Sequence, residues 1–135
     1  MLNPSTADHA QDDPTIRRCI GFAHAWGYRE LSVRNLFAYR ATYPRELLTA
    51  YEPTGGTHGD QELLAALTAD RVILAWGAGA IGGRDRQVLD LFMRRAPHAS
   101  FWCLGLTKHE HPRHPLYVSA AQSPLHYVPP SAGIP

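Results

Sequence analysis

Four short polar segments carry the side chains that could do chemistry, at residues 3–8, 35–42, 76–83 and 107–117. The first supplies an amide, two hydroxyls and a carboxylate around Pro4, which biases Asn3 toward extended backbone. Amides, hydroxyls and the imidazoles of the last segment are groups that position a water molecule or hydrogen-bond a small ligand. Each of the other three segments follows an apolar run. For residues 3–8 an ordinary frayed terminus is the alternative, so these residues alone leave the function open.

Length and composition indicate one compact domain. With 135 residues, 44% hydrophobic and 19% charged, the chain can bury a real core and is too short for two comfortable domains. We expect a single domain over residues 1–122 and a loose proline-rich tail over residues 123–135. No apolar run approaches the roughly 20 residues of a membrane helix, and no signal peptide opens the chain. The expected location is the cytoplasm, with no membrane partner.

Cysteine usage and charge exclude several function classes. The chain has two cysteines, Cys19 and Cys103, each in an apolar segment, so we expect buried free thiols and no four-cysteine iron–sulfur site. The formal net charge of +1 gives no general attraction to nucleic acid, and any polyanion would have to be bound by locally placed arginines. The spacing of His109, His111 and His114 does not favour a zinc site. We predict no metal and no cofactor.

Helical patterns occur at three places. Asp13 can cap a helix that starts at Pro14 and stops at Gly27. Asp60 is positioned to cap a second helix, and arginines flank the apolar residues of a third around residues 84–95. A brief helix is also expected after Pro44. The apolar stripes of the first two are Ile16, Cys19, Ile20, Ala23 and Trp26, and Leu63, Leu64 and Leu67.

Strand patterns alternate with these helices. Residues 31–37 are a short β-prone run, and residues 71–76 and 100–104 are nearly continuous apolar runs of the kind found in central strands. Four glycines follow the second run between Gly77 and Gly83, either as a tight turn or as a loop that cradles a phosphate. The three tryptophans lie in or at the end of apolar segments, so we expect them in the core.

Alternating strands and helices favour a mostly parallel central sheet flanked by helices, in a single three-layer α/β domain. In such sheets, ligands bind beyond the carboxyl ends of the strands. That rule places all four polar segments at one edge of the sheet and predicts a shared site there.

The same segments carry a resemblance that spans almost the whole chain. The residues concerned are 1–8 (MLNPSTAD), 12–19 (DDPTIRRC), 35–38 (NLFA), 75–77 (AWG), 107–108 (TK) and 112–117 (PRHPLY). Together they resemble domain-of-unknown-function family 1643, which occurs in bacteria and phages. That resemblance implies a family and no activity.

A weaker resemblance is to the uracil-DNA glycosylase superfamily. Its first strand ends in a Gly-x-Asn-Pro-Gly loop, which residues 2–5 (LNPS) resemble, and a later strand ends in an asparagine that reads the base, as in residues 33–36 (VRNL). Residues 74–77 (LAWG) and 114–116 (HPL) are similar to its Trp-Gly strand end and its His-Pro loop. The fold implied is glycosylase-like, with the strand before Leu2 not contained in this sequence.

This second resemblance implies roles for individual residues. Asn3 would position the attacking water, Asn35 would hydrogen-bond the base, and His114 would face the leaving oxyanion. The implied substrate is a nucleobase, nucleotide or DNA base, and the implied reaction is hydrolysis of an N-glycosidic bond. Arginine side chains in these loops would suit phosphate contacts. The predicted substrate-binding residues are Pro4, Ser5, Thr6, Asp8, Asn35, Phe37, Arg40, Trp76, Gly77, Lys108 and Arg113.

Two other functions remain open at this level. A non-catalytic module could use the same pocket for a nucleotide or modified base, or could serve a protein partner that the sequence does not identify. Alternatively, Asp8, Asp12 and Asp13 could form a metal-assisted hydrolytic cluster. Helix capping is the simpler role for these aspartates, because Pro14 follows at once.

Overall fold

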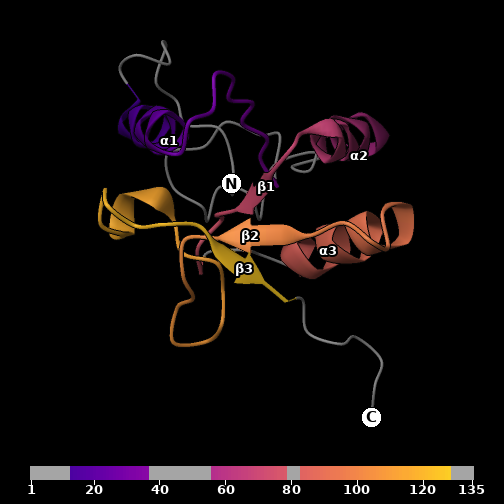
Figure 1. The fold of residues 1–135 in the computed structure, drawn as a ribbon. Helices are drawn as coiled ribbons and strands as arrows, with labels where there is room; N and C mark the ends of the chain where they lie inside the picture. The colour runs from indigo at the N-terminus through magenta and orange to yellow at the C-terminus, as the bar shows by residue number, and fades with distance from the viewer. Residues whose placement is uncertain (1–12, 37–55, 79–82, 129–135) are drawn as a thin grey trace.

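A three-stranded mixed sheet forms the centre of the protein. The computed structural model describes residues 13–36, 56–78 and 83–128. The strands β1 (Val72–Leu74), β2 (Phe101–Cys103) and β3 (Leu125–Tyr127) lie in the order β1-β2-β3 (Figure 1). β1 and β2 are parallel, with Val72 opposite Phe101, whereas β3 runs antiparallel to β2, with Tyr127 opposite Phe101. The protein is therefore an α/β domain, but its described sheet is mixed rather than mostly parallel.

Helix α1 (Pro14–Ala25) begins as its sequence predicts. The Asp13 carboxylate accepts hydrogen bonds from the backbone N–H groups of Thr15 (2.8 Å) and Ile16 (3.3 Å), and proline occupies the first helical position. The helix ends before Gly27, whose φ of +83° a glycine adopts without steric cost. The predicted apolar stripe was partly wrong. The buried side chain of α1 is Phe22, and Ile20 is exposed.

The second helix begins earlier than predicted. Helix α2 (Gly56–Ala65) continues into a 3₁₀ turn, η3 (Ala66–Thr68). Asp60 therefore lies inside the helix and is not its cap. Its carboxylate forms an ion pair of 2.8 Å with Arg84, in the first turn of helix α3 (Arg84–Arg95). Because that pair joins two helices, the structure assigns Asp60 a tertiary role.

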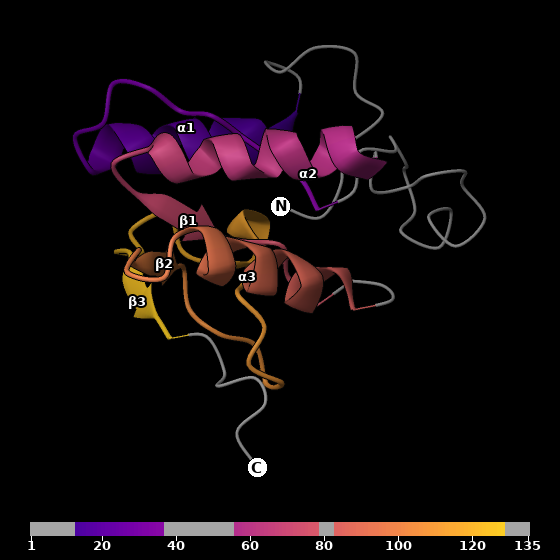
Figure 2. The same cartoon turned by 90° about the vertical axis from the view of Figure 1, so that its right-hand side faces the viewer.

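Two apolar clusters pack on the sheet. The helices α2 and α3 lie on one side of it in Figure 1, and α1 with the 3₁₀ helix η4 (Pro115–Tyr117) lies on the other. Figure 2, turned by 90°, shows α2 above α3. The ring centroids of Phe92 and Phe101 are 5.7 Å apart in the larger cluster. That cluster contains Leu36, Leu63, Leu74, Trp76, Val88, Leu89, Phe92, Phe101, Cys103 and Tyr127; the smaller contains Phe22, Ala75 and Leu104.

Three further predictions need correction. Residues 31–36 of the β-prone run form no strand, and their neighbour Phe37 lies outside the described residues. The expected tail, 123–135, contains β3 as its residues 125–127, since Tyr127 contributes an apolar ring to the larger cluster. Of the three tryptophans, Trp76 is buried, whereas Trp26 and Trp102 are half-buried. No helix among the described residues is long and apolar enough to cross a membrane.

Candidate functional site

Two of the four predicted site segments meet where the parallel strands end. Gly77, three residues beyond β1, has a φ of +78° and donates its backbone N–H to the carbonyl of Pro112 at 2.8 Å. A Cβ atom added to Gly77 would lie 3.4 Å from the Cβ of His114. The absent side chain therefore lets the loop after β1 and the loop after β2 pack directly together, as the sheet-edge rule predicts.

Residues 105–113, which follow β2, form a tightly bonded loop. Thr107 accepts a backbone hydrogen bond from Glu110 (2.9 Å) and donates one to His111 (2.8 Å). The Thr107 hydroxyl accepts a further bond from the backbone N–H of His111 (3.1 Å). Glu110 has a φ of +65°, which turns the chain back. This loop holds Lys108 at an exposed turn and returns the chain to the site at Pro112.

Arg113 is positioned by its own loop. Its Nε donates to the carbonyl of Leu106 at 3.0 Å, and its Cδ would lie 3.4 Å from a Cβ placed on Gly105. The bond uses one of the five N–H donors of the guanidinium group, and the residue is exposed. Arg113 therefore presents a positive charge on the surface beside His114.

The environment of His114 fixes its protonation state. Its Nδ1 accepts a hydrogen bond from the backbone N–H of Leu116 (3.2 Å), which caps η4. Burial lowers the pKa of His114 below the ordinary value of 6.5. The ring is therefore neutral at pH 7, and since Nδ1 is an acceptor, the proton resides on Nε2. The exposed ring of Tyr117 lies beside it, with centroids 5.6 Å apart.

Two buried polar atoms have no hydrogen-bond partner within the described part of the chain. They are the Oδ1 atom of Asn35 and the Nε1 atom of Trp76. Both residues were predicted as site residues. Asn35 precedes Leu36, which packs in the same apolar cluster as Trp76. Because an unpaired buried polar group costs about 1–3 kcal/mol, these atoms mark places where a ligand group would be stabilising.

Sequence reasoning missed the residue that binds the backbone next to Asn35. Arg84 is 4% exposed, and its Nε donates to the carbonyl of Leu36 at 2.8 Å. Its other nitrogens bind Asp60 (2.8 Å) and Gln87 (2.6 Å). Arg84 stands beside several surface arginines in the sequence, and only its position after the glycine-rich segment distinguishes it. Its role depends on partners 24 and 48 residues away.

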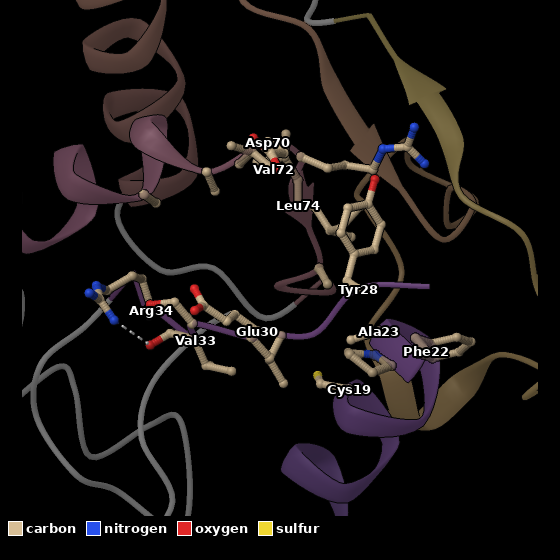
Figure 3. A pocket seen from close by; sticks show the side chains of 18 of the residues that line it. Cys19, Phe22, Ala23, Tyr28, Glu30, Val33, Arg34, Asp70, Val72 and Leu74 are labelled. Atoms are coloured by element: carbon tan, nitrogen blue, oxygen red, sulfur yellow. Dashed lines mark hydrogen bonds between the residues drawn. The ribbon is translucent and has the colours of Figure 1, made fainter. Parts of the chain in front are cut away.

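A cavity of about 630 Å³ borders the site and follows the outer edge of β1. Trp76, Leu36 and Pro115 line its end near the site, and Phe22, Trp26 and Tyr28 contribute aromatic walls. Figure 3 shows Val72 and Leu74 on one side of it, Glu30 and Val33 opposite, and Cys19 and Ala23 of α1 nearby. Its size is in the range of small-molecule sites.

Metal chemistry has no geometric support in the described ranges, which contain no group of three or more His, Cys, Asp or Glu side chains that could hold an ion. The Nδ1 of His111 lies 3.7 Å from the carboxylate of Asp85, and this pair links the loop after β2 to α3. Both cysteines are free thiols, as predicted, but only Cys103 is buried, whereas Cys19 is half-buried. Burial raises the pKa of the Cys19 thiol above 9.0, so it remains protonated and is a weak nucleophile at pH 7.

The structure thus brings together part of the predicted site. Trp76, Gly77, Arg113 and His114 lie at the junction of two loops, and Asn35 adjoins it through Leu36. Lys108 lies in the exposed turn of the same loop as Arg113. The remaining predicted residues lie outside the described ranges; these are Asn3, Pro4, Ser5, Thr6, Asp8, Phe37 and Arg40.

The fold is that of an α/β domain, and the candidate site lies at the carboxyl ends of its parallel strands. The chain belongs to the family described as "Protein of unknown function (DUF1643)", whose model matches residues 1–116. This confirms the family resemblance found in the sequence. Neither a curated protein nor a solved structure gives a significant match to the chain.

Proposed function

We propose that this domain binds a nucleobase at the carboxyl edge of its sheet and hydrolyses its N-glycosidic bond, on a three-layer fold like that of the uracil-DNA glycosylases. One observation carries the proposal. Both buried polar side-chain atoms that lack a partner in the described ranges, Asn35 Oδ1 and Trp76 Nε1, belong to residues that the sequence had assigned to the site. A ligand with one donor and one acceptor would satisfy both.

The chemistry of a nucleobase fits this pair. The edge of a pyrimidine or purine carries N–H donors and carbonyl or ring-nitrogen acceptors side by side. A donor of the base would pair with Asn35 and an acceptor with Trp76. Because both protein atoms are buried, a base lacking the matching groups would leave them unpaired and be rejected by about 1–3 kcal/mol for each group.

His114 supports the catalytic part of the proposal. In N-glycosidic hydrolysis, the oxygen of water bonds to the anomeric carbon, the carbon–nitrogen bond breaks and its electron pair leaves with the base, and the proton that the water loses ends on the base through solvent. The base departs as an anion whose charge lies partly on a carbonyl oxygen. A neutral imidazole with its proton on Nε2 is a hydrogen-bond donor suited to that oxygen. The water would be positioned by Asn3, which lies outside the described residues.

Binding without catalysis is the second candidate, and it rests on the same two unpaired atoms. Asn35 and Trp76 are recognition groups, and neither needs an activated water to contribute affinity. A nucleotide or modified-base binding module would use them and leave the glycosidic bond intact. Phosphate contacts from Arg113 and Lys108 would then favour a nucleotide over a free base.

The deciding experiment measures base release from uracil-containing single-stranded and duplex oligonucleotides, together with binding of uracil and deoxyuridine monophosphate. Asn35→Leu removes the buried, unpaired Oδ1 atom with little change in side-chain volume, so it should keep or raise the melting temperature while abolishing binding. His114→Gln should lower release at least tenfold and spare binding. His98→Gln, at an exposed turn after α3, is the matched control.

The outcomes separate the candidates. Release that depends on Asn35 and His114 supports the glycosylase. Binding that depends on Asn35 without release supports the non-catalytic module. Neither release nor binding in the parent protein refutes both.

A further inference from the structure

Arg71 lies against two aromatic rings on the α1 side of the sheet. Its guanidinium carbon is 4.4 Å from the ring centroid of Trp102 and 5.7 Å from that of Tyr28. Trp102 alternates along β2 with Phe101 and Cys103, which belong to the larger cluster, so its ring lies on the opposite face of the sheet. Attraction to the two ring faces holds the guanidinium group in one place.

The hydrogen-bonding capacity of Arg71 is unused. Within residues 13–36, 56–78 and 83–128, its guanidinium group forms no hydrogen bond and no ion pair, although the side chain is half-buried. Arg84, by contrast, donates from three nitrogens to other residues. A guanidinium group has five N–H donors in a planar fork that matches the two oxygens of a carboxylate or phosphate. Arg71 is therefore a positioned cation whose donors can bind an oxyanion.

Arg71 also lines the cavity of about 630 Å³ beside β1. The wall that α1 contributes is apolar and largely aromatic. It contains Ala23 and the stacked rings of Phe22 and Trp26, whose centroids are 5.3 Å apart. In Figure 3, the Tyr28 ring rises from the chain beside α1 toward the end of the cavity where Asp70 lies. The cavity thus offers a flat apolar wall and, at one end, a cation.

The charges around the cavity favour an anion at that end. Three arginines, Arg29, Arg34 and Arg71, and two acidic residues, Glu30 and Asp70, line it, which leaves an excess of one positive charge. Both acidic residues are exposed, so solvent and salt screen them, and neither forms an ion pair with Arg71. Arg71 is half-buried, and its charge is screened less.

We propose that this cavity binds a small aromatic anion, with its carboxylate or phosphate on Arg71 and its flat apolar body against Phe22 and Trp26. Affinity comes from charge-assisted hydrogen bonds to the guanidinium group and from the apolar area that the ligand buries. The proposal does not rest on the nucleobase site, whose Trp76 belongs to the larger cluster on the other face of the sheet. A ligand in this place would bridge α1 and β1 and stabilise the folded protein.

The test compares 2-naphthoate with 2-naphthamide, a neutral compound of nearly the same shape, by isothermal titration calorimetry on the full chain. We expect saturable binding of 2-naphthoate, at least tenfold weaker binding of 2-naphthamide, and a melting temperature that rises with the 2-naphthoate concentration. A third ligand, 2-naphthyl phosphate, identifies the oxyanion, since the anion that binds more tightly names it. The comparison needs no variant, so it stands even where a substitution impairs folding.

Paired variants locate the binding. Arg71→Met removes the cation and keeps the apolar stem, so it should weaken 2-naphthoate binding at least tenfold and leave 2-naphthamide binding unchanged. Arg95→Met, at an exposed position at the end of α3, is the matched control. Ala23→Phe fills the cavity from α1 and should abolish binding of both compounds, whereas Ala25→Phe, exposed on the same helix, should leave it unchanged.

Four results would each overturn the proposal. The first two are the absence of saturable binding of either anion by the parent protein, and equal affinities for 2-naphthoate and 2-naphthamide. The third is an unchanged affinity for 2-naphthoate in folded Arg71→Met. The fourth is displacement of bound 2-naphthoate by uracil, which would place the anion in the nucleobase site instead.

Discussion

Arg84→Met should lower the free energy of unfolding, because the Arg84 side chain links α3 to the segment at Leu36 and to Asp60 of α2. Methionine keeps most of the apolar stem and removes the hydrogen bonds to Leu36, Asp60 and Gln87. Leu36 is 1% exposed, so its carbonyl would be left unpaired in a buried position, at a cost of about 1–3 kcal/mol. The Asp60 side chain is 41% exposed, and solvent would recover most of the ion-pair energy, leaving about 0–1 kcal/mol.

The expected loss in the free energy of unfolding is therefore about 1–4 kcal/mol. At this chain length, 1 kcal/mol corresponds to roughly 3–4 °C in the melting temperature, which gives a decrease of roughly 3–16 °C. Urea unfolding followed by circular dichroism and tryptophan fluorescence measures the free energy, and coincident curves justify a two-state analysis. Arg84→Lys keeps the charge but cannot reach all three partners, so its stability should fall between those of the parent and Arg84→Met.

The control is Arg86→Met, at an exposed position of the same helix, which should change stability by no more than about 0.5 kcal/mol. A loss in the free energy of unfolding for Arg84→Met no larger than that of this control would refute the reasoning. In that case, the bond to the Leu36 carbonyl would not organise the segment that carries Asn35.

Three further predictions concern local geometry. Gly77→Ala and Gly27→Ala both place alanine in a left-handed backbone conformation, which should cost about 1–2 kcal/mol each in urea unfolding. Only at Gly77 does the new Cβ contact His114, so only Gly77→Ala should shift the imidazole signals of His114 in NMR spectra. Burial lowers the pKa of His114 in the folded protein below 6.5, so the unfolded chain takes up the proton at a higher pH than the folded protein does. The free energy of unfolding should therefore be constant above pH 6.5, fall as the pH drops through that value, and level off below the folded-state pKa. His114→Gln should remove this pH dependence. Asp13→Ala should cost about 1 kcal/mol through loss of the helix cap, whereas Asp13→Asn should cost less than half of that in the same unfolding assay.

Local signals in the sequence predicted the elements that depend on neighbouring residues. The start of α1 follows from Asp13 and Pro14 alone, because a capping carboxylate and an N-terminal proline act over three positions. The buried strands β1 and β2 follow from their apolar runs. The meeting of the Trp76-Gly77 and His114 loops follows from the parallel order of those strands, since their carboxyl ends must share an edge.

Tertiary contacts decided what the sequence could not predict. Asp60 has the residue type of a helix cap, but Arg84 binds it inside the helix. Residues 31–36 have β-forming side chains, yet Arg84 and Arg34 tie them to the helices α3 and α2. The segment 125–127 directly follows Pro124 and is only three residues long, and it becomes a strand because β2 offers an open edge beside buried Phe101.

The sheet and α3 come from one continuous stretch of sequence, and this has a consequence for folding. β1, α3, β2 and β3 all lie between residues 72 and 127, so the larger cluster forms mainly from contacts within the C-terminal half of the chain. Helix α1 joins through the smaller cluster, whose other members are Ala75 and Leu104. Short loop closures favour early formation of the C-terminal unit, and α1 can detach from the smaller cluster while the sheet stays intact. The segment that carries Asn35 connects these two parts, so local opening of α1 would alter the site before the protein unfolds.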